Sequence, residues 1–130
     1  MKHAKGFTVI ELVVVLVLLS IGLALFVAQK SGVDGAARDD KRKTAINAMY
    51  YNLEEVYYTQ NGYYPQTIDS KTLRAMDPAL FTDPSGNKLG DALSSYRYEP
   101  ADCSLDGKCK HYTLSSNLER EAEYTKSSRR

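Results

Sequence analysis

The sequence predicts an α+β protein in which one long N-terminal helix, apolar in its first half and amphipathic in its second, packs on a small antiparallel β-sheet head. Three observations lead to this fold class. Residues 7–28 form an apolar run that contains a single charge, Glu11. Residues 36–60 place apolar side chains at spacings of three and four, the period of a helix. Residues 95–99 and 110–115 alternate apolar and polar side chains, as strands do.

The apolar run, residues 7–28, is long enough to cross a membrane. At about 1.5 Å per residue it spans about 33 Å as a helix, against about 30 Å for the hydrocarbon core of a bilayer. A plain membrane anchor and a cleaved secretory signal are the simplest interpretations. Cleavage after Ala28 would place the bulky Phe26 where a signal peptidase requires a small residue, so a secretory signal is the weaker of the two.

Glu11 is the feature that neither interpretation explains. A carboxylate within a membrane helix costs about 2.5–3.5 kcal/mol, and such residues usually have a function. The residues that follow, LVVVLVLL, include no basic side chain. The basic leader, with Lys2 and Lys5, ends at Gly6, immediately before the apolar run. Glu11 therefore needs a partner that its neighbours in sequence do not provide.

The string Gly6-Phe7-Thr8-Val9-Ile10-Glu11-Leu12 closely resembles the class III signal of type IV pilins and type II secretion pseudopilins. The resemblance covers the leader and the apolar run. It implies that residues 1–6 are a leader peptide, that prepilin peptidase cuts between Gly6 and Phe7, and that the new amino group of Phe7 is methylated. It also implies that the helix is stored in the membrane and then added to a filament by a pilus assembly platform.

The chemistry of the cut end gives Glu11 a partner. Cleavage after Gly6 creates a charged amine on Phe7, about one helical turn from Glu11. In a bundle of staggered helices, the amine of one subunit can reach Glu11 of its neighbour. That ion pair would satisfy two charges inside an apolar core and would set the axial register of the subunits. Phe7 and Glu11 are therefore the predicted assembly residues.

Residues 29–61 are expected to continue the helix as an amphipathic spine that ends at the stop signal Asn61-Gly62. Glycines at 32 and 35 favour a kink or a locally melted stretch between Gln29 and Gly35. The expected apolar stripe consists of Ala45, Ile46, Met49, Tyr50, Leu53, Val56 and Tyr57. The charged side chains are expected on a solvated face: Arg38, Asp39, Asp40, Lys41, Arg42, Lys43, Glu54 and Glu55.

Residues 62–130 are expected to form a globular head with a C-terminal β-hairpin and a flexible tail. Its first part is loop-like, with one short helical candidate from Ser70 to Met76. A disulfide between Cys103 and Cys109 is predicted to close the hairpin loop, which implies an oxidising compartment. Tyr96, Tyr98, Tyr112 and Leu114 are expected to face the helix.

Composition and motifs exclude several classes of function. With 17 basic and 16 acidic residues, the formal charge of +1 gives no reason to predict a specific nucleic-acid partner, and the ten tyrosines are interpreted as packing residues. The carboxylates Asp83, Asp91, Asp102 and Asp106 do not follow the spacing of a calcium loop, so no metal and no cofactor are predicted. No Ser/His/Asp set and no phosphate-binding glycine loop is present, so the chain is not expected to be an enzyme.

The sequence therefore predicts a structural subunit of an extracellular type IV pilus, which forms a homo-oligomeric filament with other pilins. Before assembly the subunit would cross the membrane once, with its C-terminus outside the cell. Two alternatives stay open. One is a pseudopilin of a type II secretion or DNA-uptake pseudopilus. The other is a membrane-anchored binding module that never polymerises.

Overall fold

The computed structural model describes residues 6–130, so Lys2 and Lys5 of the expected leader lie outside the described residues. The chain forms two compact units, of which the first ends at Gly35 and the second is Ala36–Arg130. Helix α1, Val9–Tyr51, contributes to both units. Residues 29–35 are helical, so the prediction of a melted stretch there is wrong. The helical hydrogen bonds of this stretch outweigh the modest propensity cost of two glycines.

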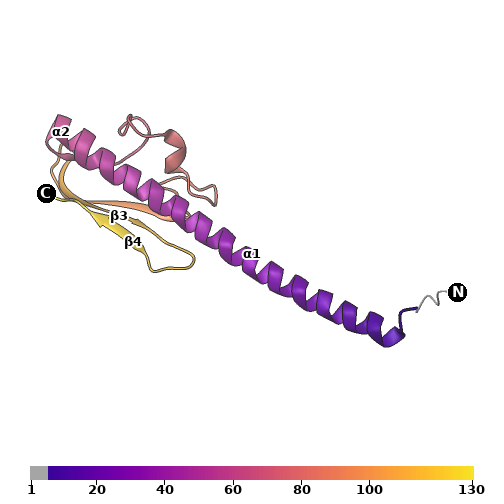
Figure 1. Cartoon of the computed structure of the whole chain (residues 1–130). Helices are drawn as coiled ribbons and strands as arrows, with labels where there is room; N and C mark the ends of the chain where they lie inside the picture. The colour runs from indigo at the N-terminus through magenta and orange to yellow at the C-terminus, as the bar shows by residue number, and fades with distance from the viewer. Residues whose placement is uncertain (1–5) are drawn as a thin grey trace. The chain divides into compact units, whose positions relative to one another are not determined.

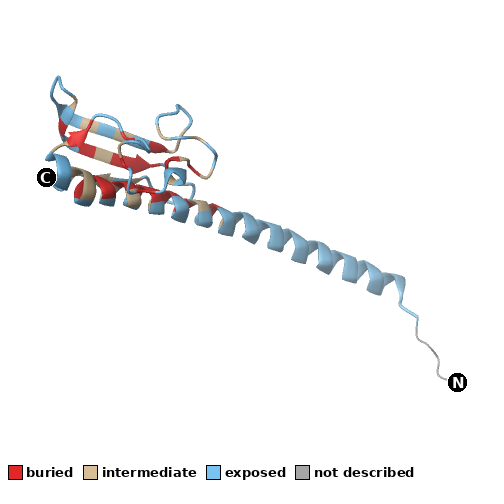
Figure 2. Cartoon of the chain, turned by 90° about the horizontal axis from the view of Figure 1, so that it is seen from above, coloured by how far each residue is buried: buried red, intermediate tan, exposed pale blue. Residues whose placement is uncertain are grey.

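The first unit consists, within the described residues, of the start of helix α1 and the three residues before it. Every residue from Gly6 to Ser31 is exposed (Figure 2), including all the large apolar side chains of the run. A window of 18 residues in this helix has a mean hydropathy of 2.9 and none of it is buried. Residues 6–130 thus contain one helix that is long and apolar enough to cross a membrane, and its apolar surface is uncovered.

The second unit is the head, in which the later part of α1 packs on a four-stranded antiparallel sheet (Figure 1). The strands are β1, Tyr64–Pro65; β2, Tyr96–Cys103; β3, Lys108–Ser116; and β4, Tyr124–Ser127. Strand β3 is central, because it pairs with each of the other three. The fold class predicted from sequence, a long N-terminal helix on a small antiparallel sheet, is confirmed.

The core of the head lies between α1 and the helix-facing side of the sheet. Ala45, Ile46 and Met49 of α1 are at most 1% exposed, and they belong to one apolar cluster with residues of the sheet. Since side chains alternate along a strand, Tyr96 and Tyr98 of β2 and Tyr112 and Leu114 of β3 lie on the side of the sheet that contributes to this cluster. The predicted inward face of the hairpin is confirmed.

The helix changes its pitch where it crosses the sheet. It continues as a π-helix, η1, Asn52–Tyr57, and ends as helix α2, Tyr58–Asn61. Gly62 follows with a φ of 75°, the left-handed conformation that the predicted stop signal requires. The wider π turn buries three consecutive residues, Asn52, Leu53 and Glu54, where an α-helix would turn at least one of them outward.

Two predictions for the rest of the head are wrong. Residues 70–76 form turns rather than a helix, and the short helix of this loop is the 3₁₀ helix η2, Pro78–Phe81, which Asp77 caps through the backbone N–H of Ala79. The flexible tail expected after the hairpin contains strand β4, whose residues Tyr124–Ser127 pair with residues 113–116 of β3. This segment pairs with β3 because the free edge of β3 presents unpaired backbone N–H and C=O groups.

Candidate processing and assembly site

The N-terminal site begins with a short stretch that precedes the helix. Gly6, Phe7 and Thr8 have no regular secondary structure, and Phe7 is 77% exposed. Thr8 caps α1, because its Oγ1 accepts from the backbone N–H of Glu11 at 3.3 Å and its carbonyl accepts from Leu12 N–H at 3.1 Å. The peptide bond between Gly6 and Phe7 therefore lies outside the helix.

Glu11 occupies the first turn of α1 and is exposed. Within residues 6–130 its carboxylate has no ion-pair partner and no side-chain donor. A carboxylate near a helix N-terminus is favoured by the helix dipole by about 0.3–1 kcal/mol. That is less than the cost of placing it in an apolar medium, so the described part of the chain leaves Glu11 in need of a cation.

Two buried charged clusters of the head hold its C-terminal segment, residues 117–130, against the helix. The first is centred on Glu54, which is 0% exposed. Its Oε1 accepts from Tyr112 Oη at 2.8 Å, from Tyr64 Oη at 3.0 Å and from the backbone N–H of Arg129 at 3.2 Å. The Arg129 guanidinium lies 3.7 Å from Oε2 and also pairs with Glu55.

The Glu54 cluster changes the acidity of the tyrosines that it binds. Burial raises the pKa of the Tyr112 phenol and of the Tyr64 phenol above their ordinary value, and the hydrogen bond to Glu54 raises both further. Both phenols are therefore neutral donors over the physiological range. Glu54 joins the helix, β1, β3 and the C-terminal segment in one network.

The second cluster lies at the start of the head and is centred on Asp39, which is 1% exposed. Asp39 accepts from the backbone N–H groups of Glu119 and Arg120 at 2.8 and 2.9 Å, and from Arg42 Nη1 at 2.9 Å. Arg42 is 4% exposed and also pairs with Glu119 at 2.9 Å. Arg38 binds Glu119 through two hydrogen bonds of 2.7 Å, and Lys43 pairs with Glu121 at 2.6 Å.

These ion pairs set the pKa values of the carboxylates. Burial alone would raise the pKa of Asp39, but the backbone N–H groups of Glu119 and Arg120 and the Arg42 guanidinium outweigh it and hold the pKa below the ordinary value of 3.8. Hydrogen bonds from Arg38 and Arg42 lower the pKa of Glu119 to about 2. The prediction of a fully solvated charged face is therefore wrong for Asp39, Arg42 and Glu54.

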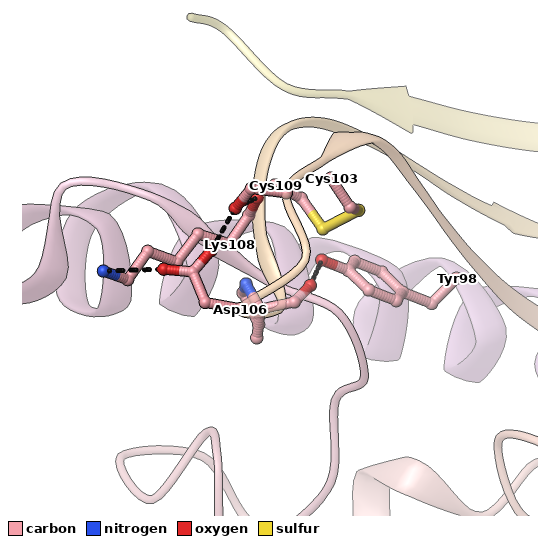
Figure 3. Close-up of a disulfide and its surroundings, with 7 residues drawn as sticks. Tyr98, Cys103, Asp106, Lys108 and Cys109 are labelled. Carbon is pink, nitrogen blue, oxygen red and sulfur yellow. Dashed lines mark hydrogen bonds and ion pairs between the residues drawn. A yellow bond between two sulfur atoms is a disulfide. The ribbon is translucent and has the colours of Figure 1, made fainter.

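Cys103 and Cys109 form the predicted disulfide at the end of the β2–β3 hairpin (Figure 3). Ser104 N–H donates to the Lys108 carbonyl at 2.8 Å within the closed loop, and Lys108 Nζ pairs with Asp106 at 3.2 Å. Tyr98 extends beside the disulfide in Figure 3, and its Oη donates to the Pro65 carbonyl at 2.6 Å. The bridge thus anchors the hairpin beside β1.

The predicted site residues fall into two groups that belong to different units. Gly6, Phe7 and Glu11 lie together at the start of the first unit, and Cys103 and Cys109 lie in the head. Glu54 and Arg129 were not predicted from the sequence. An acidic residue on a helix gives no local sign of burial, and the tyrosines that contact Glu54 are distant in the sequence. Residues 6–130 contain no group of three or more His, Cys, Asp or Glu side chains placed to hold a metal ion.

Comparison with known proteins supports the N-terminal motif. Residues 1–27 match the family model of the prokaryotic N-terminal methylation motif, which covers about a fifth of the chain. No curated protein and no solved structure matches the chain. The family information therefore applies to the N-terminal helix, and the head has to be understood from its own structure.

Together, the motif and the fold define a class. A methylation motif on an apolar helix, followed by a helix that packs on a four-stranded antiparallel sheet, is the arrangement of pilin-like proteins. The chain is a type IV pilin-like protein with the class III signal typical of type IV pilins and pseudopilins. Proteins with this motif are processed by prepilin peptidase and assemble into filaments, and they are typically structural subunits rather than enzymes.

Proposed function

We propose that this protein is a structural subunit of an extracellular type IV pilus, cut between Gly6 and Phe7, methylated on Phe7 and assembled through Phe7 and Glu11. The observation that carries the proposal is the uncovered apolar helix with one unpaired carboxylate in its first turn. An apolar helix of this length is stable in a bilayer or in a bundle of similar helices. A carboxylate there is tolerated only with a charged partner.

The partner that fits is the Phe7 amine of a neighbouring subunit. Phe7 is exposed and lies before the Thr8 cap, so an amine at that position is free to reach a second chain. Every subunit in a staggered bundle has one Phe7 amine and one Glu11 carboxylate. Each contact between neighbouring subunits therefore pairs the amine of one with the carboxylate of the other. The same pair defines how far one subunit is displaced along the filament.

The disulfide supports an orientation with the head outside the cytoplasm. Basic residues flank both ends of the apolar run, so charge alone does not define the orientation. A Cys103–Cys109 bridge forms and persists in an oxidising compartment. The head would therefore lie on the outer side of the membrane before assembly and on the filament surface afterwards.

Electron microscopy combined with mass spectrometry tests this proposal. Cells that express the protein would be sheared, and the released filaments would be imaged, labelled with an antibody against the head, and digested for N-terminal peptides. The expected result is long labelled surface filaments in which the first residue is methylated Phe7.

Each other outcome has a defined meaning. Cleaved and methylated protein that stays in the cell envelope without surface filaments would favour a secretion or DNA-uptake pseudopilus. Uncleaved protein in the membrane, or filaments whose subunits keep residues 1–6, would contradict the proposal. A variant with Gly6→Val is the matched control, because a branched side chain at the cut would block processing while leaving the apolar helix and the head unchanged.

A further inference from the structure

A hollow of about 380 Å³ lies at the end of the head where helix α2 meets the β2–β3 hairpin. Tyr58 and Tyr63 line it from the end of the helix and the turn after it, and Lys108, Lys110 and His111 line it from β3. Arg130 completes the wall. All these residues belong to the second unit, and none of them has a part in the proposed filament core.

The wall of this hollow has more cations than carboxylates. Lys108, Lys110 and Arg130 contribute positive charges against the side-chain carboxylate of Asp102, which lies 3.8 Å from His111 Nε2. Lys108 is partly neutralised by Asp106, but Lys110 and Arg130 have no ion-pair partner among residues 6–130. At the other end of the head, by contrast, Arg42 and Lys43 pair with acids of residues 117–123.

Tyrosine rings hold two of these cations in place without neutralising them. The Arg130 guanidinium lies over the Tyr58 ring at 4.8 Å from its centroid, and Lys108 Nζ lies over the Tyr63 ring at 5.3 Å. His111 Nδ1 lies 2.8 Å from the backbone oxygen of Arg130, which fixes that residue against β3. Cations that are already positioned lose little freedom when an anion binds.

The rings themselves are not free for a ligand to stack on. The Tyr58 ring is packed against Tyr64, at 4.8 Å between centroids, and Arg130 lies over it. Tyr63 has Tyr57 at 5.9 Å and Lys108 over it. The hollow therefore offers positive charge rather than an aromatic platform, and it suits a compact group with several negative oxygens.

We propose that this hollow binds the phosphate group of a ligand through Lys110 and Arg130, with Lys108 and His111 beside them. A phosphate at neutral pH has up to two negative charges and three acceptor oxygens, which match two unpaired cations better than a single carboxylate does. The volume of the hollow falls in the range of small-ligand sites. This binding site on the head is independent of the Phe7–Glu11 pairing, so its failure would leave the proposed filament role intact.

Nuclear magnetic resonance titration of the full chain in detergent micelles tests the proposal. The probe is inorganic phosphate, with sodium chloride at matched ionic strength as the reference. The expected result is a saturable shift of the amide signals of residues 108–111 and 130 with phosphate and not with chloride. The double variant K110Q/R130Q should bind phosphate at least about tenfold more weakly, because two charge-assisted contacts are lost.

The matched control is K71Q/R74Q, which removes two cations that likewise form no ion pair among the described residues and line a different hollow. It should leave phosphate binding unchanged. Phosphate shifts that do not saturate, that chloride reproduces, or that K71Q/R74Q weakens as much as K110Q/R130Q would overturn the proposal. Equal thermal unfolding of both variants and the wild type would confirm that the head stays folded.

A second titration identifies the source of the phosphate. Short oligothymidylates with and without a 5′-phosphate are compared with inorganic phosphate. Binding of both oligonucleotides would assign the hollow to a phosphodiester backbone. Binding that needs the 5′-phosphate would assign it to a phosphate monoester, and binding of inorganic phosphate alone would assign it to a small free phosphate compound.

Discussion

At the scale of single residues, the head depends on charges that are buried and fully partnered. Glu54 accepts from two tyrosine hydroxyls and one backbone N–H inside the core, and Asp39 accepts from two backbone N–H groups and an arginine. A buried charge of this kind is costly when one partner is lost, because the remaining groups cannot return to water. Both clusters are therefore expected to be sensitive to substitution.

Replacing Glu54 by Leu should destabilise the head by about 3–5 kcal/mol. The substitution leaves the Tyr64 and Tyr112 hydroxyls buried without an acceptor and removes the contact with Arg129. Thermal unfolding followed by near-ultraviolet circular dichroism reports on the change, since the chain has ten tyrosines and no tryptophan. The neighbouring Glu55→Gln is the control and should change stability by at most about 0.5 kcal/mol. Equal stability of the two variants would contradict the role of Glu54.

The Asp39 cluster makes the stability of the head depend on pH. The folded-state pKa values of Asp39 and Glu119 are lowered, the latter to about 2 from an ordinary 4.5. Depressed carboxylate pKa values contribute stability that is fully present above the ordinary values and is lost as the pH falls toward the folded values. The unfolding temperature should therefore be level at neutral pH and should fall between about pH 4.5 and pH 2.

Asp39→Asn tests which group is responsible for this pH dependence. The variant should be less stable at pH 7, because Arg42 loses its buried partner, and its unfolding temperature should change less between pH 4.5 and pH 2. Asp40→Asn, an exposed neighbour on the same helix, should keep the wild-type profile. A wild-type profile in Asp39→Asn would show that other carboxylates cause the acid sensitivity.

At the scale of elements, regular patterns in the sequence predict helices and strands. Elements that depend on contacts between residues far apart in the sequence are missed. The apolar run, the apolar stripe up to Leu53 and the alternation in β2 and β3 are regular patterns, and each became the expected element. The π-helix η1 has no local signature. It places Glu54 beside Tyr64 and Tyr112, which follow it by 10 and 58 residues, and local periodicity has no access to such contacts.

Strand β4 was missed for a related reason. Its sequence, Tyr124-Thr125-Lys126-Ser127, is short and polar, and it becomes a strand because β3 offers an unpaired edge. The loop before it is held by Asp39, Arg38 and Arg42. Two charged clusters on the helix therefore determine the course of the C-terminal segment.

The disulfide hairpin gives a prediction at this scale. The double variant C103S/C109S should lose about 2–3 kcal/mol, the loop-closure contribution of a bridge with a sequence separation of 6. The wild type under reducing conditions should unfold at the same denaturant concentration as the variant, which separates loss of the bridge from any effect of serine. Chemical denaturation with and without reductant provides the measurement. Identical stability of the oxidised wild type and the variant would contradict a stabilising role for the bridge.

At the scale of the whole molecule, the described residues leave the apolar surface of the first unit uncovered and Glu11 within it without an ion-pair partner. The head satisfies its own buried charges, whereas Glu11 does not find a cation among residues 6–130. The sequence was sufficient to predict this site, because a single charge in a long apolar run is visible without any structure. We propose that a neighbouring subunit completes it.

Filament assembly by Glu11→Ala and Glu11→Asp is the decisive measurement for the pairing of Glu11 with the Phe7 amine. The protein would be quantified in membranes and in sheared filaments of the same cells. Glu11→Ala should be cleaved and stored in the membrane but should be absent from filaments. Glu11→Asp, which keeps the charge, should assemble in part. Filaments of Glu11→Ala in wild-type amount and length would contradict the pairing of Glu11 with the amine of a neighbouring subunit.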